Sequence, residues 1–268
     1  MELKQGQHAF ITGAASGIGY GIAQALAKRG INITIADIDQ ESLDAVEGTL
    51  SSPHLCVRLD VRDEGSWRKC QMLAEESFGP VDILINNAGI GFDGRDVVDT
   101  SAQSLSEVVA INLVGVQNGL TTVGASMRER GTGHIVNTAS VMGVLPGVPG
   151  MGAYSASKAA VVALTEALRG ELAAQGIGVS VLCPGLVTSR LRENTIKLGG
   201  VVAQTVDERY VSKCPEMAPV TAGEIVAQGI TDNLPYLLTH GHYLPAVQGR
   251  ADALSASANA AESMFRPE

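Results

Sequence analysis

The sequence predicts a doubly wound α/β fold in one domain, with about seven mostly parallel strands and helices on both faces of the sheet. Short apolar runs alternate with longer segments of helical periodicity, which is typical of strands joined by crossover helices. Runs such as Ile83-Leu84-Ile85 are apolar throughout, as central strands covered on both faces are. The chain has 268 residues, 45% of them hydrophobic and 18% charged, and no linker or repeat divides it. We therefore expect residues 1–268 to form a single domain.

The same patterns place the individual elements. Strands are expected at 8–12, 32–36, 55–59, 81–85, 134–138 and 179–182, with a weaker last strand at 243–244. Helices are expected at 17–29, 40–50, 64–78, 104–130, 153–175 and 222–233. Residues 188–221 are a long irregular stretch, and because such loops are usually functional we expect a lid over a substrate site. The tail at 251–268 is rich in Ala and Ser and is expected to be a mobile helix.

Charge and cysteine content exclude several classes of protein. Lys and Arg number 19 against 28 Asp and Glu, which gives a net charge of −9. An acidic surface repels phosphate backbones, so no nucleic-acid partner is expected. Cys56, Cys70, Cys183 and Cys214 form no C-x-x-C pair and no cluster with His, which predicts reduced thiols and no metal site. The start lacks an apolar signal region and no run of about 18 apolar residues occurs, which predicts a cytoplasmic protein without a membrane span.

A glycine-rich segment, Thr12-Gly13-Ala14-Ala15-Ser16-Gly17-Ile18-Gly19, lies between the first predicted strand and the first predicted helix. Glycines allow a tight turn and let backbone N–H groups approach a pyrophosphate, and the helix N-terminus adds partial positive charge. A plain turn that happens to use Gly is the alternative, but the position within a βαβ unit favours a dinucleotide site. The expected cofactor-binding residues here are Gly13, Ser16, Gly17, Ile18 and Gly19.

Asp37 ends the second predicted strand, 18 residues after Gly19. A carboxylate at this place can accept hydrogen bonds from the hydroxyls of an adenine ribose, and it repels a 2′-phosphate. No Arg or Lys stands at positions 14, 15, 16 or 38, where a clamp for that phosphate would be expected. The sequence therefore predicts NAD(H) in preference to NADP(H). The alternative for Asp37 is a solvated turn acid or a helix cap.

Further motifs follow in order from about residue 8 to residue 244. They are Asp60-Val61, Asn86-Asn87-Ala88-Gly89, Asn112 within Ile111-Asn112-Leu113, Ser140, Tyr154-Ser155-Ala156-Ser157-Lys158 and Pro184-Gly185. Together with the three residues between Gly13 and Gly17, this series resembles the short-chain dehydrogenase/reductase family, in its common branch of about this length, whose fold is a Rossmann-type sheet. One such motif is weak evidence, but six or seven in sequence leave little room for coincidence.

The resemblance implies hydride transfer between a nicotinamide cofactor and an alcohol or carbonyl carbon, with a tyrosine as general acid or base. The catalytic residues that it implies are Asn112, Ser140, Tyr154 and Lys158. The cofactor-binding residues that it implies, in addition to those of the glycine-rich segment and Asp37, are Asp60, Val61, Asn87, Ala88, Gly89, Tyr154, Lys158, Pro184, Gly185, Val187 and Ser189.

Each implied catalytic residue has an expected role. A free Tyr has a pKa of ~10, too high for a base near neutrality. Lys158 lies four residues after Tyr154 on the same helix face, so its ammonium is expected to lower the Tyr154 pKa, and the resemblance also places it on the nicotinamide ribose. Ser140 is expected to donate a hydrogen bond to the substrate oxygen. Asn112 is expected to position a water or Lys158 in a proton relay; satisfying backbone groups at a helix kink is its alternative.

The chain departs from the family pattern at two places. Tyr154 lies 14 residues after Ser140, one more than is usual. We interpret the extra residue as an insertion in the loop at 143–152, which leaves Ser140 in place but prevents the substrate shape from being carried over. The position that often holds Thr is Ser189 here, with Thr188 just before it, and either hydroxyl can hold the nicotinamide carboxamide.

Three segments, 90–92, 141–151 and 186–220, are expected to line the substrate space. Their apolar side chains predict a hydrophobic secondary alcohol or ketone, aromatic ones included, although packing of the lid against the core is the alternative. The expected lining residues are Phe92, Met142, Met151, Leu186 and Leu191. Residues 233–240 also resemble a branch that oxidises benzylic alcohols in lignin-derived aryl ethers.

Two other functions stay open from the sequence. A 3-oxoacyl thioester reductase commonly uses NADPH, which Asp37 disfavours, as the acidic charge disfavours docking to acidic carrier proteins. A non-catalytic dinucleotide-binding sensor needs the glycine-rich segment but not Tyr154 and Lys158. The resemblance further implies a homodimer or homotetramer, assembled through the helices at 104–130 and 153–175.

Overall fold

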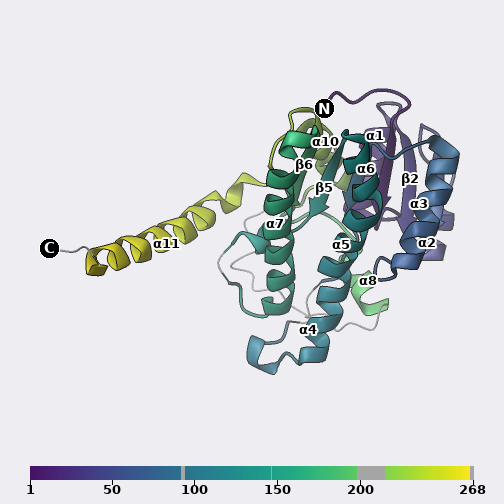
Figure 1. Ribbon diagram of the computed structural model, residues 1–268. Coiled ribbons are helices and arrows are strands. Elements are labelled where there is room, and N and C mark those ends of the chain that lie inside the picture. Colours follow the sequence, from purple (N-terminus) through teal and green to yellow (C-terminus); the bar gives the residue numbers. More distant parts are fainter. Residues whose placement is uncertain (92–93, 146, 198–214, 266–268) are drawn as a thin grey trace.

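A seven-stranded parallel sheet forms the centre of the computed structural model, which describes residues 1–91, 94–145, 147–197 and 215–265. The strands lie in the order β3-β2-β1-β4-β5-β6-β7, and each pairs with its neighbours in parallel, which confirms the predicted fold class. Figure 1 shows the sheet between the helices that cover it. Their bounds are β1 His8–Thr12, β2 Asn32–Asp37, β3 His54–Arg58, β4 Ile83–Asn86, β5 Gly133–Thr138, β6 Ile177–Cys183 and β7 Tyr236–Leu238.

Helices cover both faces of the sheet. Successive side chains of a strand point to opposite faces, so Ile83 and Ile85 of β4 join one core cluster and Leu84 joins the other. The first cluster lies under α1 (Gly17–Ala27), α2 (Gln40–Val46) and α10 (Pro219–Thr231). The second cluster lies under α3 (Glu64–Phe78) and the long helix at 102–130. A third, smaller cluster, which includes Val116 and Val161, lies under the long helix and α7 (Gly152–Leu172). The central strands are therefore buried on both faces, as the apolar runs indicate.

The long helix is continuous where the sequence pattern is interrupted by glycines. It consists of α4 (Ala102–Val109), α5 (Gly115–Gly119) and α6 (Ala125–Arg130), joined by the π-helical segments η2 (Ala110–Val114) and η3 (Leu120–Gly124). A Cβ on Gly119 would lie 2.2 Å from Oδ1 of Asn86, and one on Gly115 would lie 2.7 Å from Cγ2 of Val61. The glycines therefore let the helix approach the ends of the strands closely.

By length and composition alone, the same helix could cross a membrane. This finding differs from the expectation that no segment of the chain is long and apolar enough to do so. Of its most apolar window, 39% is buried. Ile111 and Val123 are buried in the core under the sheet, as in a helix that packs inside a folded domain.

Two expected elements differ in the structure. The strand expected at 243–244 is wrong: the last strand is β7 at Tyr236–Leu238, Tyr243 belongs to the short helix η6 (Gly241–Tyr243), and Leu244 begins α11 (Leu244–Phe265). The edge strand has only three residues and one buried side chain, Leu237, so its apolar signal is short.

Within the stretch expected to be irregular, Leu191–Lys197 forms α8, and α10 begins at Pro219, a residue suited to the first helical turn. Residues 198–214 of that stretch lie outside the described residues.

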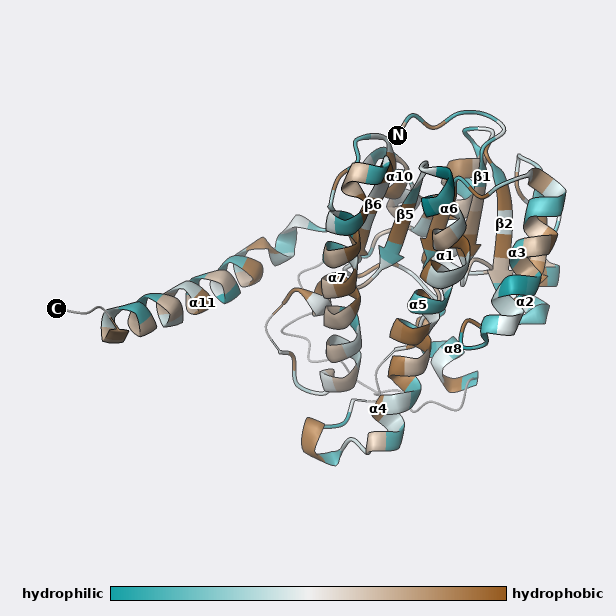
Figure 2. Ribbon diagram, in the orientation of Figure 1, coloured by the Kyte–Doolittle hydropathy of each residue, from teal (hydrophilic) through white to brown (hydrophobic). Residues whose placement is uncertain are grey.

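The C-terminal tail is a helix that begins earlier than expected and projects away from the body (Figure 1). Hydrophilic and hydrophobic residues alternate along it (Figure 2), and all of its side chains except Val247, which is partly covered, are exposed. Arg250 donates a hydrogen bond to the Leu145 carbonyl at 3.3 Å, which links its first half to the body. Mobility of this helix stays a prediction.

Candidate active site

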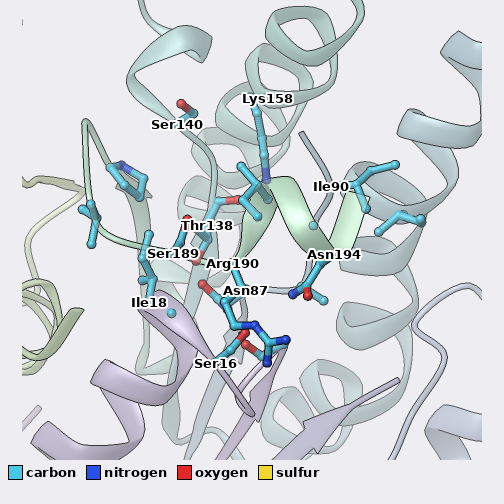
Figure 3. Close-up of a pocket in the computed structure, with 18 of the residues that line it drawn as sticks. Ser16, Ile18, Asn87, Ile90, Thr138, Ser140, Lys158, Ser189, Arg190 and Asn194 are labelled. Atoms are coloured by element: carbon cyan, nitrogen blue, oxygen red, sulfur yellow. The ribbon is translucent and has the colours of Figure 1, made fainter. Parts of the chain in front are cut away.

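The carboxyl ends of the parallel strands open into one cleft of about 640 Å³. In sheets of this kind ligands bind at that edge, because the strand ends leave a crevice between the helices on the two faces. The cleft runs from the β1–α1 loop, past the ends of β2 and β3, to α7 and α8 (Figure 3). It brings together all of the expected cofactor-binding residues except Gly19.

The glycine-rich segment has the conformation that a phosphate loop needs. Gly13 and Gly17 have φ angles of +61° and +52°, which residues with a side chain rarely adopt. Asn87 donates to the carbonyl oxygens of Thr12 at 3.0 Å and Gly13 at 3.2 Å, which ties the loop to the end of β4. A Cβ on Gly19 would lie 2.3 Å from the Gly13 oxygen, so Gly19 permits close packing beneath the loop instead of lining the cleft.

Asp37 lies at the end of β2 and lines the cleft, as expected. Its two carboxylate oxygens accept hydrogen bonds from the backbone N–H of Ala15 at 3.1 Å and of Asp39 at 3.2 Å. Burial raises the pKa of this carboxyl, and the backbone donors oppose the rise. Each carboxylate oxygen can accept a further hydrogen bond, so the group can still receive the two hydroxyls of a ribose.

Asp60 and Val61 also line the cleft, beyond the end of β3. The Arg62 guanidinium contacts both Asp60 oxygens, at 2.6 Å at the closest, and it lowers the Asp60 pKa. The Val61 carbonyl accepts hydrogen bonds from Trp67 at 3.1 Å and Asn118 at 2.9 Å. The two hydrogen bonds to its carbonyl fix the backbone of Val61 at this wall of the cleft.

Ser140, Tyr154 and Lys158 form a buried cluster at the other end of the cleft. Ser140 follows β5, and Tyr154 and Lys158 lie one helical turn apart on α7. The Ser140 side chain forms a hydrogen bond with Tyr154. The Lys158 ammonium donates to the Thr138 carbonyl at 2.9 Å and lies 5.9 Å from the centroid of the Tyr154 ring.

Burial dominates the electrostatics of this cluster. It raises the pKa of Tyr154, and the hydrogen bond with Ser140 opposes the rise only in part. Burial also lowers the pKa of Lys158 to about 8. Burial therefore shifts the Tyr154 pKa upward overall. The expected lowering contribution from Lys158, whose ammonium donates to Thr138, stays a prediction.

Asn112 lies in the π-helical segment η2 and does not line the cleft. Its Oδ1 accepts from the Ile90 N–H at 2.8 Å, and its Nδ2 donates to the Ile90 carbonyl and to Ser157 Oγ, both at 3.1 Å. It thus satisfies backbone groups beside an irregular helical turn, which is the alternative that the sequence left open. A role for Asn112 in a proton relay stays a prediction.

The extra residue between Ser140 and Tyr154 does not separate their side chains, since they form a hydrogen bond. A Cβ on Gly143 would lie 2.7 Å from the Lys158 carbonyl, so the first turn of the loop packs directly on α7. The longer path is therefore accommodated after Gly143. Of the expected substrate-lining residues, Met142, Met151, Leu186 and Leu191 line the cleft, and Phe92 lies outside the described residues.

Several residues that line the cleft were not among the individual site residues expected, although Arg190 and Lys197 lie in the stretch 186–220 that was expected to line the substrate space. Arg190 and Lys197 reach it from the stretch after β6, Arg58 from the end of β3, and Tyr243 from the segment before α11. The position of α8 places Lys197 2.9 Å from Asp39, beyond the end of β2, and no local motif could have indicated this contact. His240 contacts Thr239 Oγ1 at 2.7 Å and the Pro215 carbonyl at 2.9 Å.

Residues 7–197 match the family described as short chain dehydrogenase. The chain belongs to this family. As a short-chain dehydrogenase it is an oxidoreductase, and the resemblance seen in the ordered motifs is confirmed.

Individual relatives agree with this assignment. The oxidoreductase UcpA of Salmonella typhimurium is 36% identical over 244 residues, which cover 87% of this short-chain dehydrogenase and 90% of UcpA. The probable oxidoreductase EphD of Mycobacterium tuberculosis is 38% identical over 208 residues, 75% of this chain, but the match spans only 34% of EphD. A crystal structure of a short chain dehydrogenase/reductase from Burkholderia phymatum in complex with NAD has 32% identity and a TM-score of 0.86, covering 96% of this chain and 97% of that one.

Proposed function

We propose that this chain interconverts a hydrophobic secondary alcohol, aromatic ones included, and its ketone, with NAD(H) preferred over NADP(H). The observation that supports it most is the buried cluster of Ser140, Tyr154 and Lys158 at one end of a cleft whose other end is a phosphate loop. A dinucleotide fits these residues, because Gly13 and Gly17 leave their side of the cleft without a side chain and Asp37 has acceptor capacity left.

In this proposal the bound nicotinamide supplies or accepts the hydride. Tyr154 donates its hydroxyl proton to the carbonyl oxygen during reduction and removes the alcohol proton during oxidation. Ser140, which already hydrogen-bonds Tyr154, orients the substrate oxygen between the two hydroxyls. Lys158 stabilises the phenolate when it forms, because its ammonium lies 5.9 Å from the ring in a buried site where charge is weakly screened.

The preference for NAD(H) rests on Asp37, which lines the cleft at the end of β2. A ribose with both hydroxyls free can donate to the carboxylate, whereas a 2′-phosphate would bring two negative groups together. The solved relative from Burkholderia phymatum, whose complex contains NAD, supports the same choice.

The substrate class rests on the apolar part of the cleft. Met142, Met151, Leu186 and Leu191 line it on the side of Tyr154, and binding sites of this kind take mainly apolar molecules. The test is NADH formation from NAD with a panel of secondary alcohols, from short aliphatic to sterol to benzylic. We expect turnover with one hydrophobic class and little with the short aliphatic alcohols. Absence of turnover across the panel, with NADH binding still measurable, would instead support the non-catalytic sensor.

We also propose that the chain forms a homodimer or homotetramer through the long helix and α7. Leu105 and Val114 of the long helix are exposed, which leaves apolar surface that a second copy can cover. Light scattering at micromolar concentration is expected to give two or four times the mass of one chain, and the mass of one chain would contradict this assembly.

A further inference from the structure

The segment that follows Pro184-Gly185 lies directly on the phosphate loop. A Cβ on Gly17 would lie 3.0 Å from the Ser189 Cβ and 3.7 Å from the Arg190 backbone nitrogen. Gly17 begins α1, so the peptide between Ser189 and Arg190 lies at the helix end that attracts anions. Thr188 donates to the Met217 carbonyl and Met217 to the Leu186 carbonyl, both at 3.0 Å, which fixes this segment in place.

Arg190 reaches across the cleft from this segment. It lines the same pocket as Ser16 and Ile18 of the phosphate loop (Figure 3). Its Nη1 donates to Ser42 Oγ on α2 at 3.1 Å, and its Nε donates to Glu193 at 2.7 Å. The pair with Glu193 is exposed, with side-chain exposures of 43% and 64%, and exposed ion pairs contribute little stability. The guanidinium can therefore exchange Glu193 for a stronger anionic partner.

Helix α8, which begins directly after Arg190, is attached on both sides of the cleft. On one side Thr195 Oγ1 accepts from the Gly91 N–H at 2.8 Å. On the other side Lys197 contacts Asp39 at 2.9 Å. Arg190 is thus presented by a segment that is anchored to the ends of both β4 and β2, which fixes its backbone over the cleft.

A phosphate in this cleft has few other cations near it. The phosphate loop contains no Lys or Arg. Of the other cations among the described residues that line the cleft, Lys197 is paired with Asp39, Lys158 donates to Thr138 beside Tyr154, and Arg58 donates to the Ile38 carbonyl at 3.3 Å. Arg190 is the cleft cation whose backbone lies on Gly17.

We propose that Arg190 is a phosphate-binding residue of the cofactor site. The planar guanidinium gives up Glu193 and binds the dinucleotide phosphates opposite the N-terminus of α1, so that a positive side chain and backbone N–H groups hold the phosphates from two sides. This inference rests on the proposed function, because its ligand is the dinucleotide. It adds a binding residue that lies outside the family motifs found in the sequence.

The test separates phosphate binding from adenosine binding. Dissociation constants of NADH, ADP and adenosine are measured for the wild type and for Arg190→Met, NADH by its fluorescence and the other two by competition. We expect Arg190→Met to weaken ADP and NADH by at least ~10-fold, as loss of hydrogen bonds to a charged group does, and to leave adenosine within about 2-fold. The double variant Arg190→Met/Glu193→Gln removes the carboxylate left behind and is expected to show the same pattern.

Arg192→Met is the matched control, since Arg192 is exposed on α8 and does not line the cleft. It is expected to bind all three ligands as the wild type does. If Arg190→Met does not fold, as judged by circular dichroism, Arg190→Gln is measured in the same way. Unchanged ADP binding, or equal loss of ADP and adenosine, would overturn the inference while leaving the proposed function intact. A wild type that binds neither NADH nor ADP would overturn both.

Discussion

Replacing Tyr154 by Phe is expected to lower kcat by about 10²–10⁴-fold in both directions, because the substitution removes the proton that the reaction must move. The change deletes one buried hydroxyl and keeps the ring, so α7 and the cleft are expected to keep their shape. NADH affinity is expected to stay within about 3-fold, since the hydroxyl contributes one hydrogen bond at most to the cofactor. Stopped-flow or steady-state absorbance of NADH gives the rates, and a fluorescence titration gives the affinity.

The control for this variant is Tyr20→Phe, which removes a tyrosine hydroxyl that bonds Thr49 at 2.7 Å on the surface. It is expected to keep full turnover. A Tyr154→Phe enzyme with most of the wild-type rate would refute the general acid–base role. One that loses rate and NADH affinity together would indicate a damaged cleft instead of lost proton transfer.

The pH dependence of the wild type should carry the same signature. Burial raises the pKa of Tyr154, so the hydroxyl is protonated at neutral pH. Alcohol oxidation needs the base and is therefore expected to speed up as the pH rises from neutrality toward about 8, the pKa of Lys158, above which the ammonium that stabilises the phenolate is lost. Ketone reduction needs the acid and is expected to stay level through neutrality and to fall only at higher pH. In Tyr154→Phe, both the rise of the oxidation rate with pH and the fall of the reduction rate at higher pH should disappear.

Cofactor discrimination is expected to be the second large effect. The wild type should favour NAD over NADP by about 100-fold or more in kcat/KM, because a 2′-phosphate would lie against the buried Asp37 carboxylate. Asp37→Asn removes the charge and keeps the size, so it is expected to reduce this ratio by about 10-fold or more, mainly through KM. The measurement is kcat/KM for both cofactors with one alcohol.

Asp44→Asn serves as the matched control, because Asp44 is exposed on α2 and bonds Gln40 on the surface. It is expected to keep the wild-type preference. Equal kcat/KM values for NAD and NADP in the wild type would contradict the assignment of Asp37. A preference that survives in Asp37→Asn would place the discrimination elsewhere, with Arg58, Arg190 and Lys197 as the other charges of the cleft.

Most of the fold could be predicted from the sequence because its central strands are buried on both faces. Such strands are short and rich in apolar residues, and the β1, β4 and β5 segments are predicted to within two residues at each end. The last strand could not be predicted in this way. It has three residues at the sheet edge, only Leu237 is buried, and its pairing with β6 depends on a position that no local pattern encodes.

In the candidate site too, some features could be predicted from the sequence and others could not. Gly13 and Asp37 lie at the ends of strands, and Tyr154 and Lys158 lie in the first two turns of α7, so their places in the chain predict their meeting in one cleft. The direction of the Tyr154 pKa shift could not be predicted, because it depends on how deeply the ring is buried. The position of Arg190 over the phosphate loop could not be predicted either, since Ser42 and Gly17, which it contacts or approaches, precede it by more than a hundred residues.

The central claim is that one cleft holds a nicotinamide dinucleotide with its reactive end at Tyr154, and a crystal structure of the NADH complex tests it most directly. We predict the nicotinamide ring beside the Tyr154 and Ser140 side chains, the phosphates between the Gly13–Gly19 loop and Arg190, and the adenine ribose on Asp37. A dinucleotide bound in the opposite direction, or outside this cleft, would contradict the account.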